Sequence, residues 1–397
     1  MYDVIVVGAR CAGSPLAMLL ARKGYRVLLV DRARFPSDIL STHYIHQPGA
    51  AYLKDWGLLD RVFATNCPPI PGMHFYVGPF AIEGTAVPCG DVSVAVCPRR
   101  KILDRVLFEA AAEAGVEVRD RCYVRGVVRN GDRINGISLE TALGNASTEH
   151  ARVVVGADGQ HSIVARSVNA GEYSSAPAYS CNYYTYFSGV PAEKAELYNR
   201  ERCLIGLFPT NDDLVLVFAA YPIEEFRSNR GRLDEKFFQL LKQVPDLLER
   251  VSNGKREERF SGTTDLRGFF RKSHGPGWVL TGDAGYHKHP ITAQGITDAF
   301  RDADNLAIAL DAGLSGAVNL DYALAEYART RDEAVAEMYQ MTCELAKVEP
   351  PTLEMQQLFG AIRGNQSAID QFLGTIAGTV RISEFFAAQE RRSSGVT

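Results

Sequence analysis

Residues 3–13 read Asp-Val-Ile-Val-Val-Gly-Ala-Arg-Cys-Ala-Gly, and this stretch decides the fold. Its first five residues are largely apolar and β-branched, which is typical of a strand buried on both faces of a parallel sheet. Residues 14–23 predict a helix that ends at Gly24, and residues 26–30 predict a second buried strand closed by Asp31. Strand, turn, helix and strand form one βαβ unit of the size found in dinucleotide-binding folds.

The turn between the first strand and the helix predicts a phosphate site. Gly8 and Gly13 occupy the first and third glycine places of the dinucleotide fingerprint, while Arg10 departs from it at the second. We expect Arg10 to bring positive charge close to the pyrophosphate, beside a helix N-terminus that already favours anions. A carboxylate at Asp31 suits the ribose hydroxyls. The nucleotide contacts predicted from this unit are Gly8, Arg10, Cys11, Ala12, Gly13, Asp31 and Arg32.

Two further segments carry strand-end glycine and aspartate pairs. In residues 153–162 a buried strand runs into Gly156, Asp158 and Gly159, a pattern that by itself is also a common structural turn. In residues 281–296 a strand ends at Gly282 and Asp283, and a loop leads into a new helix. Asp283 is placed to bond sugar or ribityl hydroxyls, and the helix N-terminus directs N–H groups at an electron-rich atom.

Taken together, the three segments resemble the single-component FAD-dependent aromatic hydroxylases, the family typified by para-hydroxybenzoate hydroxylase, over roughly residues 1–345. The resemblance implies an α/β FAD-binding Rossmann-like domain of the glutathione reductase type, with an inserted β-sheet substrate domain and a C-terminal helical segment. It implies FAD as cofactor and NADPH or NADH as co-substrate, without a second nucleotide-binding unit.

The resemblance also implies roles for individual residues. Asp283 would hold the ribityl and pyrophosphate part of FAD, and Arg100 matches a helix-start arginine that reaches it. Asp158 would support both FAD and the nicotinamide cofactor. The loop residue and the helix start that would face the flavin ring system are Pro290, Gln294, Gly295 and Ile296.

The order of the segments predicts interleaved domains. We expect a discontinuous FAD-binding domain over residues 1–72, 97–172 and 272–345, and a substrate-binding β domain over residues 73–96 and 173–271. Residues 346–397 are expected to be helical, and their apolar side chains to cover the domain or a dimer partner, so that the protein is a monomer or a homodimer.

The implied reaction is hydroxylation of an aromatic or polyketide-like small molecule through a flavin C4a-hydroperoxide, which calls for a positioned base. Tyr184 and Tyr186 alternate on one predicted strand and therefore share a face, although packing aromatics are the alternative interpretation. The candidates for catalysis are His43, His46, Tyr184, Tyr186 and His287, with His289 also considered. No metal is predicted, because neither the pair His43 and His46 nor the pair His287 and His289 has an accompanying cysteine or carboxylate cluster.

Other reactions remain open. Arg10 replaces the second glycine of the dinucleotide fingerprint. The family usually has a histidine-bearing stretch after Gly-Asp-Ala, and the residues that follow Gly282-Asp283-Ala284 here are Gly285-Tyr286-His287. Residues 41–46, Ser-Thr-His-Tyr-Ile-His, resemble flavin halogenases and geranylgeranyl reductases, although the halogenase W-x-W-x-I signature is absent. The alternatives are therefore an FAD-dependent reductase of carbon–carbon double bonds, a halogenase, and a flavin-binding module without turnover.

Composition narrows the class of protein. The 397 residues carry a net charge of -4 with no basic block, which argues against nucleic-acid binding. Eight cysteines without a C-x-x-C pair suggest reduced thiols, and the first apolar run is already a strand, so we expect a cytoplasmic protein without a cleaved leader. No apolar run approaches the roughly 20 residues that span a bilayer.

Overall fold

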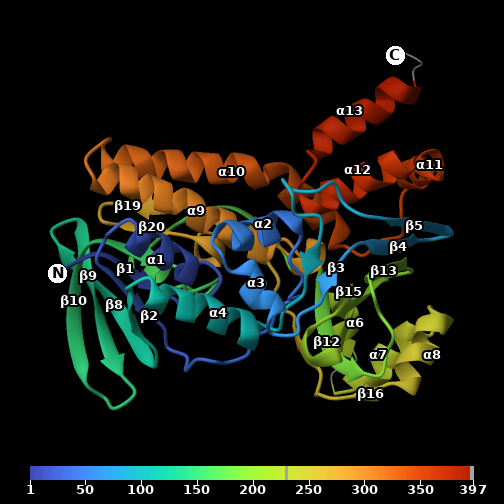
Figure 1. The fold of residues 1–397 in the computed structure, drawn as a ribbon, viewed down its shortest axis with the longest axis horizontal. Coiled ribbons are helices and arrows are strands. Elements are labelled where there is room, and N and C mark those ends of the chain that lie inside the picture. The colour runs from blue at the N-terminus through green and yellow to red at the C-terminus, as the bar shows by residue number, and fades with distance from the viewer. Residues whose placement is uncertain (229–230, 394–397) are drawn as a thin grey trace.

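The structure is a computed structural model that describes residues 1–228 and 231–393. Two large β-sheets lie side by side, and the helices surround them (Figure 1). The N-terminus lies beside the first sheet, and the last three helices gather over one end of the second sheet. Within the described residues, no helix combines the length and the apolar character that crossing a membrane requires.

The first sheet contains the nucleotide-type βαβ unit predicted from the sequence. Its strands follow the order β19-β20-β10-β1-β2-β7, and all neighbours are parallel except the β19–β20 pair. β9 extends it by pairing antiparallel with the first half of β10, and β8 pairs antiparallel with β9. The strands are β1 (Tyr2–Val7), β2 (Val27–Val30), β7 (Glu117–Arg119), β8 (Cys122–Asn130), β9 (Arg133–Thr141), β10 (Ala146–Gly156), β19 (His274–Gly275) and β20 (Trp278–Leu280).

Both faces of this sheet are buried, which explains the uninterrupted apolar sequence of β1. Val4 and Val6 face a core shared with helices α1 (Gly13–Arg22), α4 (Arg100–Glu113) and α9 (Gly295–Leu314). Ile5 and Val7 face the opposite core, which β8, β9 and α5 (Ile163–Ser167) complete. Alternate residues of one strand thus enter two cores, as the period-2 geometry of a strand requires.

The second sheet joins two segments that are far apart in the sequence. Its order is β16-β12-β15-β14-β13-β4-β5, with β17 also on β12 and a parallel pair between β4 and β13. Its strands are β4 (Met73–Val77), β5 (Phe80–Gly84), β12 (Ser180–Ser188), β13 (Ala195–Arg200), β14 (Cys203–Pro209), β15 (Val215–Pro222), β16 (Lys255–Arg256) and β17 (Ser261–Thr263).

Helices cover both faces of the second sheet. One face packs against α7 (Leu233–Leu241) and α8 (Pro245–Asn253), and the other against α11 (Leu353–Ile362), α12 (Gln366–Ala377) and α13 (Ile382–Ser393). Tyr184 and Tyr186 both lie on the α11–α13 face, so the prediction that they share a face is confirmed. Residues 394–397 of the predicted C-terminal segment lie outside the described residues.

Shorter elements connect these layers. The 26-residue helix α10 runs along α9 (Figure 1). Two small sheets are also present, the two-stranded sheet β3–β6 and the three-stranded sheet β11–β18–β21. The remaining helices and strands are α2 (Gln47–Asp55), α3 (Leu59–Phe63), α6 (Ile223–Ser228), α10 (Leu320–Leu345), β3 (Pro69–Ile70), β6 (Ala95–Val96), β11 (Glu172–Ala176), β18 (Gly268–Arg271) and β21 (Tyr286–His287).

The three sequence segments meet at one point of the first sheet. Gly8 has a φ of +104°, and a Cβ placed on it would lie 2.4 Å from the carbonyl oxygen of Ala157. A Cβ on Gly13 would lie 1.8 Å from the carbonyl oxygen of Gly8, and one on Gly282 would lie 2.8 Å from the Cβ of Ala12. Close backbone approach therefore requires glycine at these positions.

We expect Gly8→Ala to lower the free energy of unfolding by about 3 kcal/mol or more, because it adds a backbone clash to an unfavourable φ. Gly24→Ala is the matched control, since Gly24 has a φ of +89° and open space around it, and it should cost only about 1–2 kcal/mol. Urea unfolding measures both variants. Equal losses would contradict the close approach of Gly8 to Ala157.

Candidate active site

The glycine turn is held in place by the carboxylate at the end of β2. Asp31 accepts hydrogen bonds from the backbone N–H of Ala9 at 2.8 Å and of Ala33 at 2.7 Å, and it is buried. Arg32, the next residue, is exposed. Asp31 thus lies at the turn where a nucleotide ribose was predicted, and it also fixes the conformation of that turn.

Two arginines meet on one fully buried carboxylate beside the turn. Arg10 forms an ion pair with Asp104, and Arg100 binds the same carboxylate through two hydrogen bonds of 3.0 and 3.1 Å. Arg10 also donates to the side chain of Ser37 at 2.9 Å, so it is held against the protein. Cys11 lies against Asp104, and burial raises the pKa of its thiol to about 12.

Sequence analysis missed Asp104. The available signal was its position four residues after Arg100, which places both side chains on one face of α4. One carboxylate cannot neutralise two guanidinium groups, so this cluster keeps net positive charge next to the glycine turn. Such a surplus suits an anionic pyrophosphate.

The carboxylate of Asp158 is held by its own strand-to-helix turn, at the start of α5. It accepts hydrogen bonds from Ser162 Oγ at 2.5 Å and from the backbone N–H of Ile163 at 2.6 Å. Burial raises its pKa. Both oxygens are therefore engaged at the start of α5, and the predicted support of FAD and the nicotinamide cofactor remains a prediction.

Asp283 and the start of α9 form the opposite side of the turn. Asp283 is exposed, and its carboxylate has no hydrogen-bond partner within residues 1–228 and 231–393, while it interacts electrostatically with Arg100. Pro290 begins a short 3-10 turn that leads to α9. Gly295 is exposed at the helix N-terminus, and a Cβ on it would meet no atom within 4 Å.

These observations fit a bound FAD. A glycine turn with surplus positive charge fits the pyrophosphate, and a partnerless exposed carboxylate fits ribityl hydroxyls. An open helix N-terminus fits an electron-rich ring edge. Gln294 and Ile296, on either side of Gly295, are buried, and Gln294 donates to the carbonyl of Ile376 at 2.5 Å.

His43 and Tyr186 form a buried hydrogen-bonded pair between the two sheets. The hydroxyl of Tyr186 lies 2.7 Å from Nε2 of His43, and both residues are almost fully buried. Burial, followed by the charges of Arg100 and Arg99, lowers the pKa of His43 well below its usual value, so the imidazole is neutral. Its Nδ1 is buried and has no hydrogen-bond partner in the part of the chain that the structure describes.

Arg99 extends this pair towards the surface. Its guanidinium lies 4.3 Å from the ring centroid of Tyr186, and it forms ion pairs with Asp38 at 3.2 Å and Glu258 at 2.5 Å. Tyr184 packs edge-on against His43, with ring centroids 5.4 Å apart. Sequence analysis predicted the histidine and both tyrosines but not Arg99, whose partners are distant in the sequence.

The three other candidate histidines, His46, His287 and His289, are held by hydrogen bonds to protein atoms. His46 Nε2 donates to the carbonyl of Thr292 at 3.0 Å, and burial lowers its pKa to about 4. His289 bonds Ser180 Oγ at 3.0 Å and accepts from Ile291 N–H at 3.2 Å, and burial lowers its pKa to about 4 as well. His287 Nδ1 donates to the carbonyl of Arg267 at 2.6 Å.

A small cavity of about 10 Å³, with room for about one water molecule, lies beside His46. Residues of α12 form part of its wall. Its lining residues are Tyr44, His46, Gln47, Gly72, Met73, Ala86, Leu373, Ile376 and Ala377.

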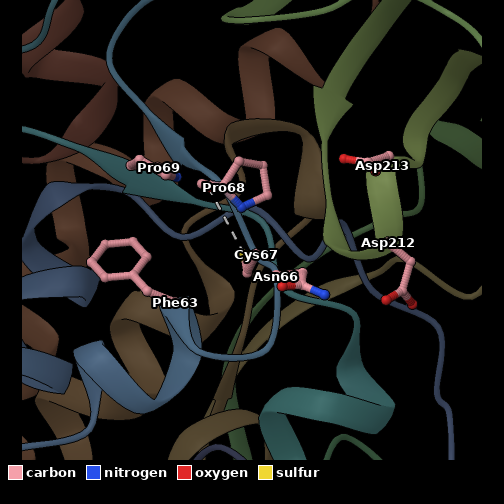
Figure 2. A pocket seen from close by; sticks show the side chains of 7 residues that line it. All are labelled: Phe63, Asn66, Cys67, Pro68, Pro69, Asp212 and Asp213. Carbon is pink, nitrogen blue, oxygen red and sulfur yellow. Dashed lines mark hydrogen bonds between the residues drawn. The ribbon is translucent and has the colours of Figure 1, made fainter.

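A second hollow, of about 520 Å³, opens between α3 and the β14–β15 turn. Figure 2 shows Phe63 and the carboxylates of Asp212 and Asp213 on opposite sides of it. No predicted site residue lines this hollow, whose lining residues are Phe63, Asn66, Cys67, Pro68, Pro69, Asp212 and Asp213. The smaller cavity is therefore the one that adjoins the candidate site.

Comparison with known proteins agrees with this geometry. Residues 1–342 match the family model described as FAD binding domain. Digeranylgeranylglycerophospholipid reductase from Methanosarcina acetivorans is 29% identical over 334 residues, which cover 81% of this chain and 78% of the reductase. Rifampicin monooxygenase from Rhodococcus hoagii is 28% identical over 329 residues, which cover 80% of this chain and 65% of the monooxygenase, so the match spans less than two thirds of that protein.

The fold matches a solved flavoprotein over nearly the whole chain. The flavin-dependent brominase Bmp2 superimposes with a TM-score of 0.82 over 99% of both chains, at 19% identity. These similar proteins are thus named for three different reactions, as a reductase, a monooxygenase and a brominase. Family resemblance alone leaves the choice among these reactions open.

The buried histidines predict how stability depends on pH. The unfolded chain protonates His46 and His289 near pH 6.5, whereas the folded chain does so only near pH 4. Between these values the unfolded state binds more protons, so the free energy of unfolding falls as the pH falls, by about 2 kcal/mol per histidine from pH 7 to pH 5. Urea unfolding across this range measures the slope.

His289→Gln should make that slope shallower, because it removes the contribution of this histidine. His161→Gln is the control, since the side chain of His161 is 72% exposed, and it should keep the wild-type slope. A slope that His289→Gln leaves unchanged would show that this histidine is not held neutral by the fold.

Proposed function

This chain belongs to the FAD binding domain family, and from that premise we propose that it is an NAD(P)H-consuming monooxygenase that hydroxylates an aromatic small molecule. The overall reaction consumes Ar–H, O2, NAD(P)H and one proton, and yields Ar–OH, water and NAD(P)+. When bound, FAD supplies the transfer of two electrons and the activation of oxygen.

The residues that would hold FAD are those around the glycine turn. Backbone N–H groups at residues 8–13, with Arg10 and Arg100, would bind the pyrophosphate, and Asp31 the ribose. The free carboxylate of Asp283 would accept hydrogen bonds from ribityl hydroxyls, and the N–H groups at Gln294, Gly295 and Ile296 would face the flavin ring edge. The second sheet would form the substrate side of the site.

The buried pair of His43 and Tyr186 is the observation that carries the choice of hydroxylation. A phenol or an aromatic amine becomes a stronger nucleophile when a base accepts its proton. His43 is neutral, and its Nδ1 has no hydrogen-bond partner among the described residues, so the imidazole would accept a hydrogen bond from the substrate or from Tyr186. Its lowered pKa makes it a weak base, so the pair would polarise the substrate hydroxyl or amine rather than deprotonate it fully. Arg99, held by two carboxylates, would keep Tyr186 in position.

One observation disfavours the halogenase alternative, because the W-x-W-x-I signature of halogenases is absent from the sequence.

The direct test is to load the purified protein with FAD and to measure NAD(P)H oxidation and oxygen uptake across a panel of phenols and aminoaromatics. We expect at least one compound to stimulate both. Absence of oxygen uptake with the whole panel would overturn the proposal, and anaerobic reduction of a prenyl alkene would replace it with the reductase reaction.

We expect Tyr186→Phe to lower kcat for hydroxylation by about 100-fold, because it removes the hydrogen bond to His43. FAD content should stay at the wild-type level, and the ratio of hydrogen peroxide to product should rise. Tyr183→Phe is the matched control, because Tyr183 lies on the other face of the same strand. Wild-type kcat in Tyr186→Phe would show that the pair only packs.

A further inference from the structure

A buried ion pair joins the loop before α9 to the first turn of that helix. Lys288 lies in this loop, and its ammonium forms an ion pair with Asp298 of α9. Their side chains are 2% and 9% exposed. Sequence analysis singled out neither residue, and neither takes part in the proposed reaction. Apolar side chains of similar size often stabilise a fold as well as a buried ion pair does, so packing alone does not require this pair.

The carboxylates at the start of α9 outnumber the cations that the helix itself supplies. Arg301 binds Asp298 at 2.8 Å and also Asp302 at 2.7 Å, so one guanidinium serves two carboxylates. Lys288 is the second cation in contact with Asp298. Without Lys288, this part of α9 would carry a surplus of negative charge.

The neighbouring helix α10 adds no net charge to this region. Burial raises the pKa of Asp302, and the charges of Arg301 and Arg331 oppose that shift, so Arg331 lies near the cluster. Arg331 also binds Asp332 at 2.6 Å, and α10 therefore contributes one cation together with one carboxylate. The balance at the start of α9 thus depends on the cation from the loop.

The pair consists of an ammonium and a carboxylate. Burial raises the pKa of Asp298, but the charges of Lys288 and Arg301 outweigh this effect and hold the pKa below its usual value. Burial lowers the pKa of Lys288, and the carboxylate of Asp298 opposes that shift. Each group therefore keeps its partner charged.

The pair lies within one helical turn of the α9 N-terminus. Gly295 begins the helix, and Asp298 follows three residues later, which is about 5 Å along the helix axis. In the proposed function, the N–H groups at this end face the flavin ring edge, where the partial positive charge of the helix stabilises negative charge. An unneutralised carboxylate in the first turn would offset that partial charge.

We infer that Lys288 is a positioning residue of the flavin site, which neutralises Asp298, keeps the field at the α9 N-terminus positive and so favours reduced over oxidised FAD. The inference rests on the flavin placement in the proposed function, and it is independent of the substrate and of the hydroxylation step. It goes beyond that function by assigning a role to a buried charge that acts through the helix.

The test is an anaerobic redox titration of FAD-loaded protein, followed by flavin absorbance, which needs neither oxygen nor substrate. We expect Lys288→Met to change the ratio of affinities for reduced and oxidised FAD about tenfold, because it leaves a carboxylate uncompensated. The midpoint potential should therefore fall by about 30 mV for the two-electron couple. Asp298→Asn should raise it by a similar amount, because it leaves the ammonium uncompensated.

The double variant Lys288→Met/Asp298→Asn should return to the wild-type potential, because both charges are gone. Lys23→Met is the matched control. Lys23 pairs with Asp311 of the same helix at 2.8 Å, but with side chains 41% and 36% exposed and about 20 Å further along the helix than Asp298. This variant should keep the wild-type potential.

If Lys288→Met does not retain FAD, the rise expected for Asp298→Asn decides, since asparagine keeps the shape of the side chain. The inference is overturned if the FAD-loaded single variants keep the wild-type potential, or if both shift it in the same direction, as a purely structural role would. Failure of the proposed function is a separate result, because it appears as absent oxygen uptake while the potentials follow the expected order.

Discussion

Close backbone approach at the glycine turn is the constraint on which the rest of the structure depends. The carbonyl of Ala157 occupies the space that a side chain on Gly8 would need, and the carbonyl of Gly8 occupies the space next to Gly13. Ala12 in turn contacts Gly282. These contacts bring the ends of β1, β10 and β20 and the start of α1 together, so that the side chains after each strand surround one site.

Positive charge lies on one side of that turn and an exposed carboxylate lies on the other. Asp104 is fully buried and is shared by two arginines, which leaves a positive balance on one side. Asp283 remains exposed and without a hydrogen-bond partner in the described residues on the other side. Further from the turn, burial keeps His43, His46 and His289 neutral. The site therefore offers charge where phosphates would bind and neutral polar groups where a proton would move.

Local sequence patterns predicted the parts of the structure that depend on local geometry. The βαβ unit, the buried strand before Gly282 and the shared face of Tyr184 and Tyr186 follow from the spacing of apolar and glycine residues within short segments. The contact between His43 and Tyr186 joins residues 143 positions apart. No short-range pattern encodes that contact.

The contact between α12 and the residue before α9 could not be predicted from the sequence either. The apolar residues of α12 indicated only that the helix is buried, and the hydrogen bond from Gln294 to Ile376 depends on how the chain returns to the first sheet. Asp104 is the exception among the missed residues, because its spacing from Arg100 on a predicted helix was visible in the sequence. Tertiary contacts thus determined most of what the sequence alone did not predict.

In the proposed reaction, one oxygen atom of O2 is inserted into an aromatic substrate at this site. The most direct measurement is mass spectrometry of the product formed under 18O2 from whichever aromatic compound stimulates NAD(P)H oxidation. We predict one 18O atom per product molecule and one NAD(P)H consumed for each. A product without 18O, or turnover that continues without oxygen, would contradict the account.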